Sequence, residues 1–133
     1  MKKTLIAASI LTLALAAAPA FAADTDASTS TSASTDDNGG YKAEAKSTST
    51  DAAGTTTTDV KKVKKSVSNN GDYKKTTKVS HKRNPKGLTN PSTKSSTEDT
   101  VQKSGDKVTT EHVEKQNGDT VQDTKTESNT SGQ

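Results

Sequence analysis

The side chains of this sequence with the most chemical potential are its two histidines, His81 and His112. Residues 111–114 read Glu-His-Val-Glu and offer three metal-ligating side chains within four residues. A metal site needs three or four ligands held in a fixed geometry, and we find no sign of a scaffold that would hold these. We therefore expect solvated histidines, no metal and no cofactor. The serines lack a nucleophile-elbow context, so we predict that the protein is not an enzyme.

Basic residues are the second candidate for function, because they gather in the middle of the chain. Ten of them form three neighbouring clusters and are the predicted polyanion-binding residues: Lys61, Lys62, Lys64, Lys65, Lys74, Lys75, Lys78, Lys82, Arg83 and Lys86. Such a density of positive charge attracts polyanions through counterion release. Only Tyr73 lies close enough to stack on a base, so we expect no base-specific recognition. The alternative is a charge run that serves solubility and is neutralised by the chain's own acidic flanks.

Charge divides the chain after residue 22 into three zones. Residues 23–59 carry seven acids and two lysines, for a net charge of −5. Residues 60–97 carry eleven Lys and Arg against one acid, for +10, and residues 98–133 carry eight acids and four lysines, for −4. We interpret the first zone as a disordered Ser/Thr-rich acidic linker, the second as a basic segment and the third as an acidic polar segment.

The first 22 residues are typical of a cleavable export signal. Lys2 and Lys3 precede an apolar run from Leu5 to Ala18, and Pro19 follows it. The small residues Ala20 and Ala22 then define a cleavage site before Ala23. The apolar run is too short for a membrane span, which needs about 20 residues. We therefore expect a signal-peptide helix that signal peptidase removes during export, and a periplasmic or secreted protein.

The remaining 111 residues contain few side chains that could form a core. The eleven large apolar ones are dispersed along the sequence, whereas Ser and Thr make up 37 positions and Cys is absent. Burial of so few apolar side chains offsets only a small part of the conformational entropy lost on folding. The sequence therefore predicts a mostly intrinsically disordered chain.

Short polar β-hairpins within residues 60–127 are the local structure that the sequence favours. Asn-Gly pairs at 70–71 and 117–118 are hairpin signals, and each stands in a weak repeat that runs from a valine to Gly-Asp. We prefer a three-residue loop at 70–72, which places Val63 opposite Val79. The loop at 117–119 likewise places Val113 and Val121 on one face. Solvated turns in a random chain are the alternative, because isolated hairpins are marginally stable.

Residues 75–90 carry a resemblance to a group of proteins. Lys/Thr-rich runs surround the stretch Asn-Pro-Lys-Gly-Leu at residues 84–88. This pattern, from Val60 to about Thr126, resembles small uncharacterised exported proteins of Gram-negative bacteria with Lys/Thr-rich polar repeats. The resemblance implies export and no particular activity.

The sequence as a whole predicts a non-enzymatic exported protein that binds anionic envelope components through its basic centre. The expected partners are anionic polymers or lipid headgroups, namely lipopolysaccharide, acidic polysaccharide or extracellular DNA, and no small-molecule substrate. The alternative is a secreted or periplasmic interaction protein that becomes ordered on a protein partner.

Overall fold

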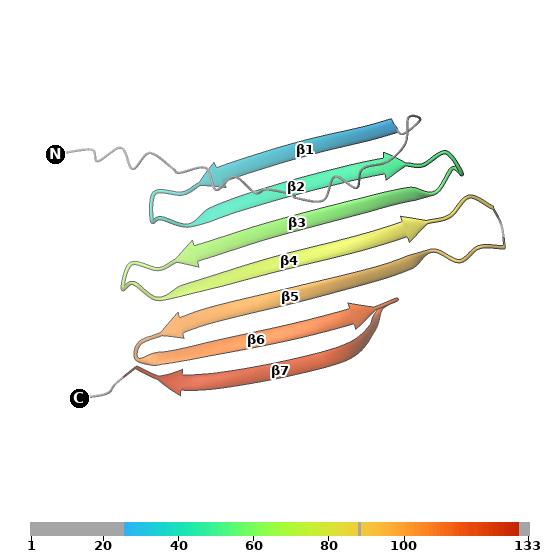
Figure 1. Cartoon of the computed structure of the whole chain (residues 1–133). Coiled ribbons are helices and arrows are strands. Elements are labelled where there is room, and N and C mark those ends of the chain that lie inside the picture. The colour runs from blue at the N-terminus through green and yellow to red at the C-terminus, as the bar shows by residue number, and fades with distance from the viewer. Residues whose placement is uncertain (1–25, 88, 131–133) are drawn as a thin grey trace.

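Seven threonine- and serine-rich segments form one antiparallel sheet in the computed structural model, which describes residues 26–87 and 89–130. Each strand pairs with its neighbours in the sequence, so the sheet order is β1-β2-β3-β4-β5-β6-β7 (Figure 1). The strands are β1 (Asp26–Thr35), β2 (Tyr41–Thr50), β3 (Thr56–Val67), β4 (Tyr73–Asn84), β5 (Thr93–Ser104), β6 (Lys107–Gln116) and β7 (Asp119–Asn129). Threonine and valine favour this conformation because their branched side chains fit a pleated surface.

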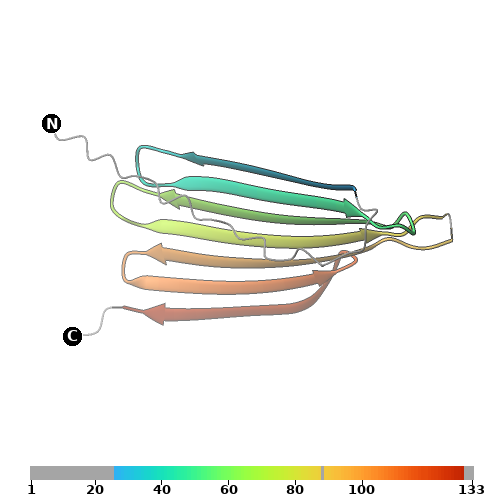
Figure 2. The ribbon, with the colours of Figure 1, turned by 45° about the horizontal axis from the view of Figure 1, so that its top comes forward.

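The sheet is a single layer. The two ribbon views show all seven strands side by side, with no second sheet or helix against them among the described residues (Figures 1 and 2). The buried side chains of residues 26–87 and 89–130 are accordingly few, and they are Ala45, Val63 and Thr55. Within the same residues there is no helix of the length and apolarity that a membrane crossing requires.

Three turns share one geometry and join the first four strands. In each, an N–H donates across the turn to the carbonyl four residues later, and the third loop residue is a glycine with positive φ. The closing pairs are Asp36–Gly40, Asp51–Thr55 and Ser68–Asp72, and the glycines are Gly39, Gly54 and Gly71. This is a three-residue hairpin loop with a glycine bulge, in which the left-handed position favours glycine. Asp36 and Asp51 also accept backbone N–H groups within their turns.

The last two hairpins have tighter turns. Asn117 and Gly118 have φ of 53° and 98°, which is the pair of positive values that a type I′ turn requires. Gly105 has φ of 58° and begins the two-residue connection between Ser104 and Lys107. These turns explain why the Asn-Gly and Gly-Asp repeats in the sequence fall at strand ends.

The prediction of a mostly disordered chain is wrong. The described residues, 26–87 and 89–130, form the seven-stranded sheet with its turns, and β1 and β2 lie within the stretch that we expected to be a disordered linker. The expectation counted only large apolar side chains. A single-layer sheet is also stabilised by its backbone hydrogen bonds and by contacts between side chains on neighbouring strands. Half-buried threonines such as Thr48, Thr58 and Thr76 contribute to these contacts.

The expected register of the first hairpin is also wrong, although its loop length is right. Val63 lies opposite Thr77 and not opposite Val79. The loop is residues 69–71, because the bulge needs its glycine in the third position. The second hairpin has a two-residue loop, and a bulge near Lys115 then brings Val113 opposite Asp123. The expected signal-peptide helix and the cleavage residues Ala20, Ala22 and Ala23 lie outside the described residues.

Candidate anion-binding face

Successive residues of a strand point to opposite sides of the sheet, and directly paired residues share a side. The side that contains Val63, here called the valine face, carries seven of the eleven large apolar side chains, and both tyrosines are among the seven. These are Tyr41, Val63, Val67, Tyr73, Val79, Val101 and Val108. The opposite side, here called the lysine face, carries the even-numbered residues of β1–β5 and the odd-numbered residues of β6. The sheet therefore has one mixed apolar face and one polar face.

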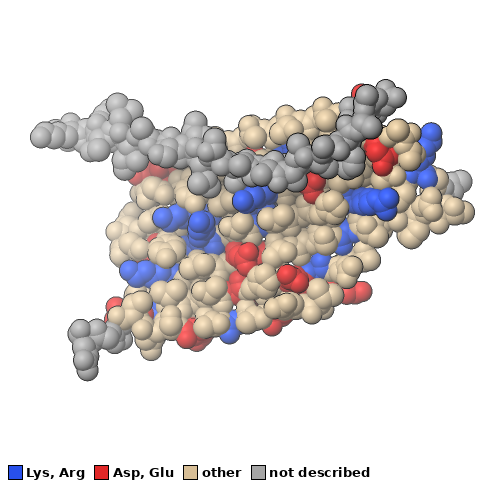
Figure 3. All heavy atoms as spheres, viewed as in Figure 1, with Lys and Arg blue, Asp and Glu red and all other residues tan. Residues whose placement is uncertain are grey.

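Positive charge is concentrated on the lysine face. Its eleven lysines are Lys42, Lys46, Lys62, Lys64, Lys74, Lys78, Lys82, Lys94, Lys107, Lys115 and Lys125. Six acids share that face, namely Asp26, Glu44, Glu98, Glu111, Asp123 and Glu127, so its strands carry a net +5. The valine face has five basic and four acidic strand residues, for a net +1. Figure 3 shows one face, on which basic and acidic side chains are interspersed among uncharged ones.

The sheet divides the ten basic residues predicted from the sequence between its two sides. Five lie on the lysine face, namely Lys62, Lys64, Lys74, Lys78 and Lys82. Four lie on the valine face, namely Lys61, Lys65, Lys75 and Arg83. Lys86 lies in the connection between β4 and β5. Adjacent residues in one sequence cluster, such as Lys61 and Lys62, are therefore separated by the thickness of the sheet.

A compact group of exposed lysines spans three strands of the lysine face. This lysine cluster consists of Lys42 on β2, Lys62 and Lys64 on β3, and Lys74 and Lys78 on β4, all of them exposed. Lys42 lies directly opposite Lys64, and Lys62 directly opposite Lys78. Like charges in directly opposed positions destabilise a sheet. A bound anion between them would relieve that repulsion.

Two acids neutralise Lys62 and Lys78, and the other three lysines of the cluster have no acid partner among the described residues. The Lys62 Nζ lies 2.9 Å from Glu44 Oε2, and the Lys78 Nζ lies 3.4 Å from Glu98 Oε2. Within residues 26–87 and 89–130, Lys42, Lys64 and Lys74 form no ion pair. These three lysines are the part of the cluster with charge available for an external anion.

The tyrosines lie on the side away from the lysine cluster. Tyr73 is on the valine face, where the Lys65 Nζ sits 5.2 Å from the centre of its ring in a cation–π contact. Tyr41 shares that face. The described part of the lysine face therefore has no aromatic ring on which a base could stack, and its chemistry is that of point charges.

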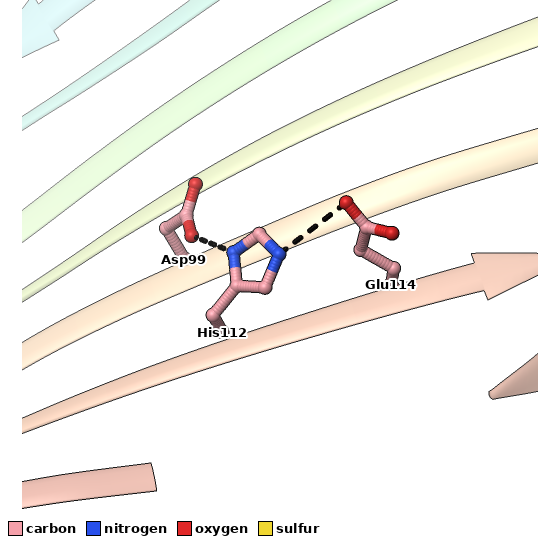
Figure 4. Close-up of polar contacts among 3 residues, drawn as sticks. All are labelled: Asp99, His112 and Glu114. Carbon is pink, nitrogen blue, oxygen red and sulfur yellow. Dashed lines mark hydrogen bonds and ion pairs between the residues drawn. The ribbon is translucent and has the colours of Figure 1, made fainter. Parts of the chain in front are cut away.

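Each histidine forms a cross-strand pair with an aspartate on the valine face. Asp59 lies opposite His81, and Asp99 lies opposite His112, each with 2.5 Å between the carboxylate Oδ1 and the ring Nδ1. The Nε2 of His112 is also 3.4 Å from Glu114 Oε1 (Figure 4). Glu111 projects from the other face, so the sheet separates it from His112. Carboxylates therefore contact both ring nitrogens of His112.

The carboxylates around His112 should raise its pKa in a measurable way. The hydrogen bond to Asp99 raises the pKa of His112 above 6.5, Glu114 adds to this, and partial desolvation opposes it. The contacts of protonated His112 with these carboxylates therefore stabilise the folded state fully below pH 6.5. This contribution is lost as the pH rises through the higher pKa that His112 has in the folded state. In an NMR titration we expect Asp99→Asn to lower the His112 midpoint. Asp59→Asn is the control, because Asp59 contacts His81 and not His112. If Asp59→Asn lowered the His112 midpoint as much as Asp99→Asn does, Asp99 would not be the cause of the raised pKa.

Sequence reasoning missed the lysines that β2 and β5 bring to the lysine face. Lys42 and Lys46 lie in the acidic first zone, and Lys94 lies beyond the predicted clusters. Lys94 lies directly opposite Lys82. Strand alternation could have separated the two faces, but only the pairing of strands brings Lys42 beside Lys64.

Comparison with known proteins gives no further guide to the site. No family model matches the chain, and neither curated proteins nor solved structures give a match.

Proposed function

We propose that this is an exported, non-enzymatic protein that binds an anionic polymer of the cell envelope or its surroundings through the lysine face. The observation that carries the proposal is the directly opposed pair of Lys42 and Lys64, beside Lys74, without an acid partner in the described sheet. Neighbouring strands lie about 4.8 Å apart, so the cluster presents a dense array of ammonium groups. A polymer with repeated phosphates or carboxylates can contact several of them at once.

The type of ligand follows from the composition of this face. Lysines bind phosphate and carboxylate as point charges, without the planar geometry of arginine. No aromatic side chain accompanies the cluster within the described strands, so recognition depends on charge density and not on base identity. The export signal in the sequence supports a site of action outside the cytoplasm, where lipopolysaccharide, acidic polysaccharide and extracellular DNA are the available polymers.

Binding to lipopolysaccharide and to a DNA duplex tests the proposal. We expect the triple substitution of Lys42, Lys64 and Lys74 by glutamine to weaken both interactions by about tenfold or more, at roughly 0.5–1 kcal/mol for each exposed contact. With the duplex, the slope of log K against log salt should fall by about three. Fluorescence anisotropy at several salt concentrations measures both quantities.

A matched control removes the same charge from the other face. Lys65, Lys75 and Lys103 lie on the valine face, and their triple substitution by glutamine should change affinity and salt slope much less. Equal losses in the two triple variants would show that net charge alone governs binding. Absence of binding to both polymers at low salt would refute the proposed function and support the solubility interpretation.

A further inference from the structure

Among residues 26–87 and 89–130, β1 has a pairing partner on one side only. At the β1–β2 turn, the Asp36 N–H donates to the Gly40 carbonyl over 2.9 Å, so the even-numbered residues of β1 point their backbone groups toward β2. Because backbone direction alternates along a strand, the odd-numbered residues point theirs to the open edge. These residues are Ala27, Thr29, Thr31, Ala33 and Thr35. Each presents a donor and an acceptor with no partner in the described sheet.

Nothing in β1 protects this edge from pairing with another strand. Natural edge strands are commonly blocked by charged side chains, prolines or bulges. β1 has a single charge, at Asp26, it contains no proline, and its register with β2 is unbroken over ten residues. All ten of its residues are exposed.

The opposite edge does have such protection. β7 carries Asp123, Lys125 and Glu127 at alternate positions, and a bulge interrupts its pairing with β6. The two edges therefore differ, and β1 is the one suited to accept a strand.

The sequence of β1 identifies the strand that fits. Residues 27–33 read Ala-Ser-Thr-Ser-Thr-Ser-Ala in both directions, with Ser30 at the centre. Two antiparallel copies that meet at Ser30 therefore place Ala27 opposite Ala33, Ser28 opposite Ser32 and Thr29 opposite Thr31. An interface with twofold symmetry needs this kind of self-complementarity, because the same patch serves both partners.

The backbone agrees with the same alignment. Pairing about Ser30 sets odd-numbered residues opposite odd-numbered residues, which are those with outward backbone groups. Four such pairs form between residues 27–33 of the two copies, and each exchanges two hydrogen bonds. A shift of this alignment by one residue would set odd-numbered residues opposite even-numbered ones, so the outward N–H and C=O groups would no longer match. It would also place the valine face of one copy beside the lysine face of the other. Ser30 would face its symmetry mate as a non-hydrogen-bonded pair.

We propose that β1 is a dimerisation edge and that its partner is the β1 strand of a second copy of this chain. The two copies form one continuous sheet of fourteen strands, twice the seven of one chain, with the twofold axis at Ser30. Assembly stops at two copies because both outer edges are then β7. The lysine faces of both copies lie on the same side of the sheet.

Cysteine cross-linking tests the alignment directly, because the natural chain has no cysteine. In Ser30→Cys the two Cα atoms should lie about 4.5 Å apart, within the range of a disulfide. Ser28→Cys is the matched control, since its two copies are four residues out of register, about 13 Å apart. We expect a disulfide-linked dimer from Ser30→Cys under mild oxidation and much less from Ser28→Cys. Equal cross-linking of the two variants would refute the alignment.

Proline variants test the edge. Thr31→Pro removes an outward N–H and leaves the ladder to β2 intact, because that N–H is not part of it. Sedimentation equilibrium should give twice the chain mass for the natural protein and at least a tenfold weaker dimer for Thr31→Pro. Circular dichroism checks that the variant keeps its strands. Asp123→Pro makes the same change on the β7 edge and should leave the dimer unchanged.

Two results would overturn the proposal. One is a single-chain mass at every concentration up to about 1 mM, together with no cross-linking of Ser30→Cys. The other is open-ended fibres that Asp123→Pro abolishes, since they would mean that β1 pairs with β7 of the next copy.

Discussion

Replacing Val63 by aspartate is expected to abolish cooperative folding of the sheet. Val63 is 4% exposed on β3, and it lies between Ala43 on β2 and Thr77 on β4. A carboxylate at this position would be buried, and the residues directly opposite it on both neighbouring strands are uncharged, so its desolvation is costly. We expect the free energy of unfolding to fall by about 3 kcal/mol or more, which is a large part of the stability of a small domain.

The matched control is the same substitution at Val79. This residue lies on the same face and on the neighbouring strand but is 44% exposed, so aspartate there stays hydrated. We expect a loss of about 1 kcal/mol or less. Urea unfolding followed by far-UV circular dichroism measures both changes. If the two variants lost equal stability, Val63 would not be part of a core.

The position of this small core could not be predicted from the order of residues. The valines are dispersed along the sequence: β1 and β2 have none, β3 has three, and each later strand has one or two. A period of two is visible in hydropathy only where apolar and polar residues alternate, and Ser-Thr alternation such as that of β1 gives no such contrast. Pairing of the strands collects Tyr41, Val63 and Val101 on one face.

Turn chemistry, in contrast, could be predicted locally. Asn-Gly at 117–118 and Gly-Asp at 105–106 do occupy turns, because positive φ is a property of the residues themselves. The loop predicted at residues 70–72 lies one position later in the sequence than the observed loop at residues 69–71. Aspartate or serine before the loop, as at Asp36, Asp51 and Ser68, is the signal that would have aligned all three turns.

The candidate site was predictable to the same extent. The lysines of β3 and β4 could be found because they are close in the sequence, and alternation assigns each to a face. The contribution of Lys42 could not, because it depends on the pairing of β2 with β3, which brings residues 22 positions apart into opposition. The ion pairs that separate neutralised from available lysines also depend on strand pairing, and that of Glu98 with Lys78 depends on the pairing of β4 with β5.

A sheet with so small a core must owe much of its cohesion to contacts between strands. Cross-strand threonine pairs illustrate them: the hydroxyls of Thr50 and Thr56 lie 3.1 Å apart, and those of Thr76 and Thr100 lie 3.4 Å apart. Such pairs add roughly 0.2–1 kcal/mol each, and every central strand has neighbours on both sides. Loss of one central strand would therefore remove two interfaces, whereas change at an edge affects one.

Proline at Thr77 tests this dependence on the central ladder. The hydrogen bond from the Ser68 N–H to the Asp72 carbonyl orients the even-numbered residues of β4 toward β3, so the N–H of Thr77 points to its partner Asp99 on β5. Proline removes that donor and leaves a carbonyl without its bond in the middle of the sheet. We expect a loss of about 2–4 kcal/mol, and loss of amide protection throughout β3 to β6 in hydrogen exchange.

Thr31→Pro provides the comparison, because it is the same substitution on the same face of an edge strand. Its missing N–H points away from β2, so the unfolding free energy of the separated chain should change by less than about 1 kcal/mol. The difference between the two variants measures how far stability rests on pairing at both sides of a strand. Equal tolerance of proline at both positions would mean that β4 is not paired with β5 as the sheet has it. In that case the ion pair of Lys78 with Glu98, which depends on the pairing of β4 with β5, would not stand.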